Sequence, residues 1–101
     1  MHNSPVELLA MIDHAVLKPD CTRREILEAC QIGKQHRLGC ICVPPTWASV
    51  AVVQLTDSPT PVSSVVGFPF GFALSGTKAA EASALMAAGC AELDMVVNIS
   101  A

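Results

Sequence analysis

The sequence has few charged or aromatic side chains, and it contains no tyrosine. Charged residues make up 15% of the 101 residues, compared with roughly 25% in ordinary soluble domains. The six lysines and arginines are scattered, aromatic residues account for only 4%, and the net charge is −3. A nucleic-acid surface needs clustered basic residues and stacking aromatic rings. We therefore expect no nucleic-acid partner.

Long apolar runs are also missing. No segment approaches the ~20 residues of a membrane-spanning helix, and the first residues do not resemble a secretory leader. We therefore expect no membrane partner. Yet 51% of the residues are hydrophobic and the mean hydropathy is +0.48, which is apolar for so short a chain. We expect part of the surface to be buried against other polypeptide, either in an oligomer or within a larger domain.

Five cysteines occur, an odd number, in segments that look helical or strand-like. Disulfide frameworks belong to loop-rich secreted chains, so reduced thiols in a cytoplasmic protein are the better interpretation. Cys40 and Cys42 share one face of an expected strand, but no second cysteine or histidine pair completes a metal site. Buried packing is the favoured role for both cysteines, although Cys42 is close enough to the strand end to line a pocket.

Capping signatures and glycine or proline breaks divide the chain into alternating helices and strands. A capping box at Thr22–Glu25 is expected to open the second helix, with Gly39 closing the segment, and Gly89 is expected to end the last helix. The expected helices cover residues 4–11, 22–38, 46–55 and 77–88. The expected strands cover residues 12–16, 40–43, 62–68 and 92–98.

Strands that alternate with helical crossovers predict a parallel sheet and an α/β fold. Four βα units are half of a (β/α)8 barrel of ~250 residues. An open doubly wound sheet is the alternative, but residues 16–20 are not the glycine-rich phosphate loop usual after its first strand. We expect a partial TIM barrel with about four parallel strands, intervening helices and a short N-terminal helix.

Two carboxylates, Asp13 and Asp94, fall inside expected strands. Over residues 92–98, apolar and polar side chains alternate, so one strand face is apolar and the other acidic. An unpaired buried carboxylate is costly, and reactive groups of parallel barrels lie at the C-terminal ends of strands. Both aspartates are therefore candidate acid–base groups. A structural hydrogen-bonding role is the alternative, and it weighs more heavily for Asp13.

The lysines, by contrast, all fall outside the expected strands. Lys18 lies in a loop, Lys34 on the outer side of a helix and Lys78 near a helix start. A Schiff-base amine must be desolvated or otherwise shifted to a lower pKa. We therefore expect each lysine to be a solvated charge.

Four motifs occur in order along the chain: residues 12–20, residues 40–45, residues 66–71 followed by Lys78 and Glu81, and residues 88–99. Together they resemble the N-terminal half of deoxyribose-phosphate aldolase. The GFP-x-G loop and the E-x-D-M-V-x-N-I strand are its most specific parts. Ala15 and Pro44 depart from the family, which usually has threonine and asparagine there.

The resemblance implies a cytoplasmic class I aldolase on a TIM barrel, a lyase without metal or cofactor. The reaction that the resemblance implies is the reversible cleavage of 2-deoxy-D-ribose 5-phosphate to glyceraldehyde 3-phosphate and acetaldehyde through a lysine Schiff base. The family's proton-relay aspartate corresponds to Asp94 and its first-strand aspartate to Asp13. Cys42 corresponds to a cysteine close to the substrate pocket.

The lysines and phosphate-binding loops implied by the resemblance lie beyond residue 101. Residues 1–101 are therefore expected to be the N-terminal half of one barrel without a second domain, and to be inactive alone. The expected partners are a small phosphorylated sugar and either further copies of the chain or the missing C-terminal half. The rival hypothesis is a non-catalytic half-barrel that associates with itself.

Overall fold

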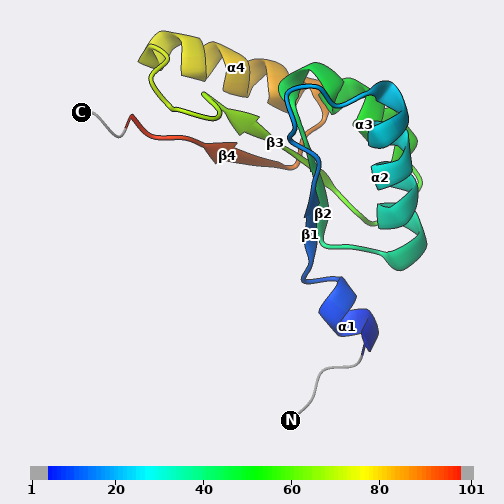
Figure 1. Ribbon diagram of the computed structural model, residues 1–101. Coiled ribbons are helices and arrows are strands. Elements are labelled where there is room, and N and C mark those ends of the chain that lie inside the picture. The colour runs from blue at the N-terminus through cyan, green and yellow to red at the C-terminus, as the bar shows by residue number, and fades with distance from the viewer. Residues whose placement is uncertain (1–4, 99–101) are drawn as a thin grey trace.

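The computed structural model describes residues 5–98 as four parallel strands alternating with helices (Figure 1). The elements are α1 (Pro5–Leu9), β1 (Asp13–Ala15), α2 (Arg23–His36), β2 (Cys40–Val43), the 3-10 turn η1 (Pro45–Trp47), α3 (Ala48–Gln54), β3 (Val62–Val66), α4 (Ser75–Ala88) and β4 (Glu92–Met95). The strands form one parallel sheet in the order β1-β2-β3-β4. This arrangement is a partial (β/α)8 barrel, which confirms the expected fold class.

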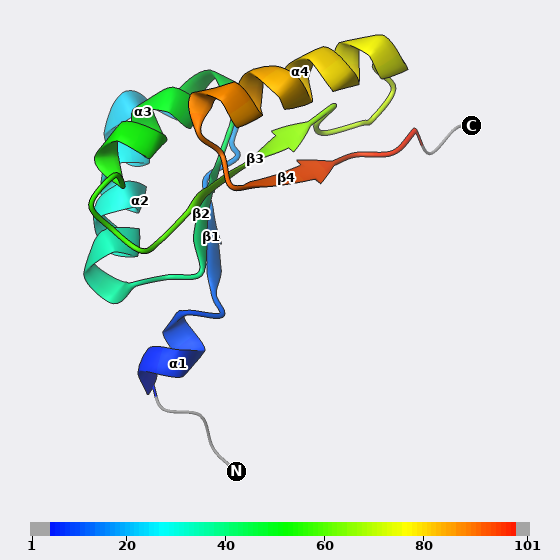
Figure 2. The same cartoon turned by 180° about the vertical axis from the view of Figure 1, so that it is seen from behind.

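Helices α2, α3 and α4 lie on one side of the curved sheet, as the two opposite views show (Figures 1 and 2). Side chains that alternate along the strands point toward these helices and form the core. The largest fully buried side chains of this core include Ile41 and Val43 on β2, Val66 on β3 and, from the helix layer, Ile26 on α2. No described helix covers the other face, which is called the helix-free face below.

Burial falls from the middle of the sheet to its edges. Every residue of β2 and β3 is buried, whereas β1 and β4 are mostly exposed. Each edge strand has a neighbour on one side only within residues 5–98. No helix in this part of the chain is both long and apolar enough to cross a membrane.

The start of α2 is as the sequence predicts. The backbone N–H of Glu25 donates to the Thr22 hydroxyl at 3.2 Å, and the Thr22 N–H donates to the Glu25 carboxylate at 3.3 Å. The end differs, because Arg37 rather than a glycine adopts the left-handed conformation after the helix (φ 52°). Gly39 is required for another reason. A Cβ there would lie 2.5 Å from the carbonyl oxygen of Ala10.

Other boundaries shift by a few residues. The helix expected over residues 46–55 is divided into η1 and α3, and α4 begins at Ser75 instead of residue 77. The first helix ends at Leu9 instead of residue 11, and residue 4, where it is expected to begin, lies outside the described residues. Gly89 ends α4 in a left-handed conformation, as predicted.

The strand expected over residues 92–98 is shorter than expected and lies at an edge of the described sheet. Leu93 packs against the core, but Met95 is 56% and Val97 68% exposed. Its apolar face is therefore covered only at the start of the strand. Ile99, which would continue the alternation, lies outside the described residues. β3 also ends early, at Val66, where Gly67 takes a positive φ of 69°.

A buried hydroxyl joins α2 to the segment before β3. Thr60 is 3% exposed, and its hydroxyl lies 3.1 Å from the Gly33 carbonyl and 2.8 Å from the Leu38 carbonyl. Both carbonyls belong to the end of α2 and the turn that follows it. The Gly33 carbonyl already accepts the backbone N–H groups of Arg37 and Leu38, so the separate contribution of the hydroxyl is its hydrogen bond to the Leu38 carbonyl beyond the helix end.

Thr60→Val is expected to destabilise the chain by about 1–3 kcal/mol, because it keeps the shape and removes the donor to the buried Leu38 carbonyl. Urea unfolding would measure the change. Thr56→Val is the matched control, since the exposed Thr56 hydroxyl also donates to backbone carbonyls, at 3.0 Å. Equal losses for the two variants would contradict the assignment.

Candidate active site

The helix-free face carries most of the side chains that the sequence singled out. Asp13 pairs in register with Cys40, and Ala15 with Cys42. Cys42 pairs with Ser63, and Ser63 in turn with Glu92, while Val65 pairs with Asp94. Since paired positions project to the same side of a sheet, these residues share one face. The expected site residues on this face are Asp13, Cys42 and Asp94.

The two aspartates are nevertheless separated. Asp13 lies on edge strand β1 and Asp94 on edge strand β4, with β2 and β3 between them. Both residues are exposed, because no described segment covers the edge strands. Within residues 5–98 neither aspartate is buried, and their acid–base role stays a prediction.

The thiols on this face are buried and protonated. Cys40 Sγ lies 3.4 Å from the Ser63 hydroxyl. Burial raises the pKa of Cys40 to about 11; the Ser63 hydrogen bond opposes this shift, and interaction with Asp13 adds to it. Burial also raises the pKa of Cys42, and the charges of Asp94, Asp13 and Glu92 contribute to the shift. Cys42 is thus not an activated nucleophile, since nucleophilic attack requires the thiolate.

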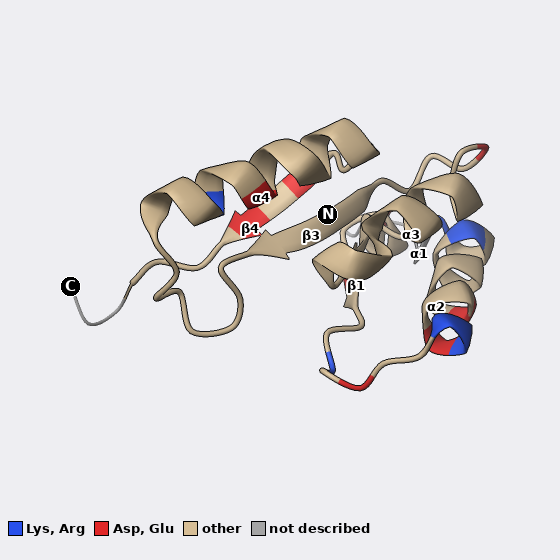
Figure 3. Ribbon diagram, turned by 90° about the horizontal axis from the view of Figure 1, so that it is seen from above, with Lys and Arg blue, Asp and Glu red and all other residues tan. Residues whose placement is uncertain are grey.

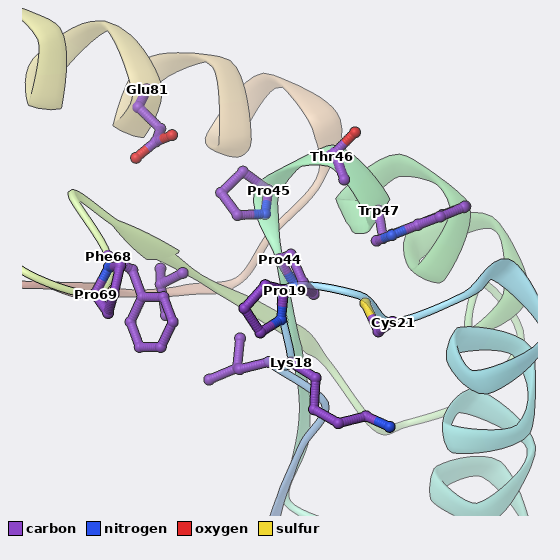
Figure 4. Close-up of a pocket in the computed structure, with 12 residues that line it drawn as sticks. Lys18, Pro19, Cys21, Pro44, Pro45, Thr46, Trp47, Phe68, Pro69 and Glu81 are labelled. Carbon is purple, nitrogen blue, oxygen red and sulfur yellow. The ribbon is translucent and has the colours of Figure 1, made fainter.

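A cavity of about 290 Å³ lies among the loops that follow β1, β2 and β3 (Figure 4). Its walls are mainly apolar, with contributions from Leu17, Pro44, Trp47 and Phe68, and Glu81 reaches it from α4. Asp13, Cys42 and Asp94 do not line it. Val65 links the cavity to the candidate residues, because it lines the cavity and is the register partner of Asp94.

Two of the three lysines are held in exposed ion pairs. Lys18 Nζ lies 2.8 Å from the carboxylate of Glu25, and Lys34 Nζ lies 2.9 Å from that of Asp57. The hydrogen bond to Glu25 raises the pKa of Lys18, which makes it a poorer nucleophile at neutral pH. Most basic positions lie on and around α2, which also carries acidic positions, while α4 carries Lys78 and Glu81 and β4 carries Glu92 and Asp94 (Figure 3).

Lys78 differs from the expected solvated charge. It is half-buried, and its Nζ donates to the carbonyl of Val96 at 2.9 Å. One helical turn further, Glu81 accepts a hydrogen bond from the N–H of Gly67, also at 2.9 Å. Sequence reasoning missed the role of both residues. The only signal was their place after the GFP-x-G loop at a spacing of three, which puts them on one helix face.

Metal coordination finds no support within residues 5–98, where no three histidine, cysteine, aspartate or glutamate side chains are grouped closely enough to hold an ion.

The sequence is similar to curated aldolases over most of its length. It is 39% identical over 94 residues to deoxyribose-phosphate aldolase 1 of Oceanobacillus iheyensis, covering 93% of this chain and 42% of the relative. It is 41% identical over 91 residues to the deoxyribose-phosphate aldolase of a Geobacillus strain, covering 90% of this chain and 41% of that protein. The chain is homologous to deoxyribose-phosphate aldolases. It spans about two fifths of their length. No protein-family model matches it.

Solved aldolase structures have the same fold. A crystal structure described as a putative deoxyribose-phosphate aldolase from Coccidioides immitis matches with a TM-score of 0.92 and 33% identity, over 97% of this chain and 39% of that one. The deoxyribose phosphate aldolase of Aeropyrum pernix, described as a tetramer, matches with a TM-score of 0.90 and 28% identity, over 96% and 42%. The four βα units of this aldolase homologue therefore have the fold of the matching part of these barrels.

The free energy of unfolding of this aldolase homologue is expected to fall as the pH rises from 9 toward 11. The folded-state pKa of Cys40, about 11, lies above the ordinary value of 9.0, so the unfolded chain loses this proton first. The contribution of the protonated Cys40 thiol to the free energy of unfolding is complete below pH 9 and is lost as the pH passes through the folded-state pKa. Cys40→Ala should make the fall shallower in urea unfolding at several pH values, whereas Cys21→Ala should not.

Asp94→Asn is expected to lower the pKa of Cys42, because it removes one of the negative charges that raise it. The ¹³Cβ chemical shift of Cys42, followed as a function of pH, measures this directly. Asp57→Asn is the control, since Asp57 pairs with Lys34 far from the helix-free face. An unchanged Cys42 titration in Asp94→Asn would show that the aspartate does not act on the thiol.

Proposed function

We propose that residues 1–101 supply the first four βα units of a class I deoxyribose-phosphate aldolase built as one (β/α)8 barrel. The observation that carries the proposal is the match to curated aldolases over 93% of this chain but only 42% of the relative. The open sheet supports it, because both edge strands and the helix-free face are those of a barrel whose remaining strands come from elsewhere.

The proposed reaction is the reversible cleavage of 2-deoxy-D-ribose 5-phosphate to glyceraldehyde 3-phosphate and acetaldehyde. The Schiff-base lysine comes from outside residues 1–101. Lys18 and Lys34 are ion-paired on the outer surface, and the ammonium of Lys78 is bound to a backbone carbonyl, so none offers a free amine to the helix-free face. Neither metal nor organic cofactor enters the proposed chemistry.

Asp94 is the proposed proton-transfer group, acting at the substrate hydroxyl and at the carbon that becomes the methyl group of acetaldehyde. It lies near the C-terminal end of its strand, where parallel barrels carry their catalytic groups. Asp13, on the same face, helps hold the polar network. Cys42 borders the substrate as a protonated thiol, in keeping with its raised pKa.

The second half of the barrel is the proposed partner of this chain, and association of complete barrels is the proposed higher assembly. The tetramer described for the Aeropyrum pernix protein supports an oligomer. All five cysteines are free thiols, which supports a reducing, cytoplasmic location.

The rival hypothesis, a non-catalytic half-barrel, draws on the same open edges. In a parallel sheet, β4 of one copy could pair with β1 of a second copy and close eight strands. Light scattering distinguishes the two hypotheses. A discrete, cooperatively unfolding dimer without activity supports the rival, whereas a chain that becomes active only with the second half supports the aldolase.

The isolated chain is expected to show no retro-aldol turnover above a denatured control, when the assay is coupled to detection of glyceraldehyde 3-phosphate. A chimera that joins this chain to the part of the Geobacillus aldolase that it does not match should be active. In that chimera, Asp94→Asn should reduce kcat by about 10²–10⁴-fold, the usual contribution of a positioned acid–base group.

Asp57→Asn is the matched control for the chimera, because it removes an exposed carboxylate on the outer surface. A folded chimera without activity would overturn the aldolase proposal. Full activity of the Asp94→Asn variant would remove Asp94 from the mechanism and leave the reaction itself standing.

A further inference from the structure

Two side chains of α4 fasten the C-terminal ends of the last two strands to one helix. Glu81 accepts a 2.9 Å hydrogen bond from the N–H of Gly67, the first residue after β3. Lys78 Nζ donates a 2.9 Å hydrogen bond to the carbonyl of Val96, the first residue after β4. We call Lys78 and Glu81, with these two backbone partners, the α4 clamp.

The two side chains act on backbone groups although their spacing would suit a different contact. Residues three apart on a helix are neighbours, and a lysine and a glutamate so placed can pair with each other. Here each turns to a strand end instead, and both hydrogen bonds are partly buried. Charged groups form stronger hydrogen bonds than neutral ones, so the clamp holds each strand end firmly.

The aliphatic part of Lys78 also depends on Gly67. A Cβ on Gly67 would lie 3.0 Å from Lys78 Cε, which is close enough that the lysine side chain would have to shift by a few tenths of an ångström. The same glycine has a φ of 69°, which disfavours other residues. Gly67 therefore contributes to both hydrogen bonds of the clamp: its N–H donates to Glu81, and its lack of a side chain leaves room for Lys78.

The strand ends held by the clamp are also bonded to each other. The N–H of Val96 donates to the carbonyl of Val66 at 2.9 Å, and the N–H of Gly71 donates to that of Gly67 at 2.8 Å. Val96 therefore has its N–H fixed by β3 and its carbonyl fixed by Lys78. Asp94 is only two residues before Val96 in the chain and pairs in register with Val65 on β3.

We infer that Lys78 and Glu81 are positioning residues for Asp94, and that they set the placement of its carboxylate at the C-terminal end of β4. The inference rests on the proposed function, because it assigns to Asp94 a catalytic geometry that must be maintained. Lys78 acts through the Val96 carbonyl and touches neither Asp94 nor the substrate. Glu81 acts through Gly67, which keeps β3 and its ladder to β4 in place.

The first test uses amide hydrogen exchange on the 101-residue chain, followed by NMR. Lys78→Met keeps an unbranched apolar side chain over Gly67 but removes the ammonium, so exchange at Val96 should accelerate about tenfold or more. Lys78→Arg, which retains a donor, should restore most of the protection. Lys34→Met removes an exposed lysine of α2 and should leave Val96 unchanged. Glu81→Leu should accelerate exchange at Gly67, whereas Glu81→Gln, which keeps an acceptor, should do so less.

The second test measures kinetics in the chimera with the Geobacillus segment. Lys78→Met should lower kcat by about tenfold or more, because small displacements of a catalytic group are costly, with KM changing less than threefold. Lys78→Arg should recover most of kcat. A merely structural lysine would lower the melting temperature without this separation of kcat from KM, so each variant is assayed well below its own melting temperature.

The outcomes separate this inference from the proposed function. An active parent chimera whose Lys78→Met variant keeps full kcat, or a Val96 amide that exchanges at the parent rate in Lys78→Met, would overturn the inference alone. A folded parent chimera without activity would overturn the proposed function, and this inference with it. Faster exchange together with a lower kcat that arginine restores would support the positioning role.

Discussion

The parallel ladder between β2 and β3 is the constraint on which the rest of the structure depends. Within residues 5–98, it is the one place where two neighbouring strands are buried on both faces. Because side chains alternate along a strand, the ladder sends Ile41, Val43 and Val66 into the helix layer and Cys42 to the opposite face. Parallel pairing also brings the C-terminal ends of all strands to one end of the sheet. The cavity, Asp94 and the α4 clamp lie at that end for this reason.

The exposed parts of the molecule follow from the edges of the same sheet. β1 and β4 lack an outer neighbour within residues 5–98, and the loop after β3 exposes Phe70 and Phe72, whose rings stack at 5.5 Å. Apolar surface of this kind usually marks a contact with other polypeptide. It also accounts for the composition, since a chain with 15% charged residues has little polar material to cover a small domain. Asp94 is exposed for the same reason, because it lies on the edge strand β4.

Features determined by neighbouring residues in the chain could be predicted from the sequence. The capping box at Thr22 and the left-handed glycine at Gly89 depend on hydrogen bonds within one turn, and both are present. Features determined by packing between segments could not. Gly39 looked like a helix terminator, but its space is needed for the Ala10 carbonyl, while Arg37 ends the helix. Similarly, Lys78 looked solvated because its acceptor, the Val96 carbonyl, lies 18 residues away.

The contrast between local features and packing between segments also applies to the proposed site, which cannot be described by its catalytic aspartate alone. The position of Asp94 in the sequence fixes which face it occupies, since register and alternation decide that. In the proposed positioning role, its placement depends also on other residues: Val66 binds the Val96 N–H, and Lys78 binds the Val96 carbonyl. Gly67 lies beside these contacts, and its lack of a side chain leaves room for Lys78. The GFP-x-G loop, the lysine and glutamate of α4, and the aspartate of β4 are therefore one mechanical unit, although they are spread over some thirty residues of sequence.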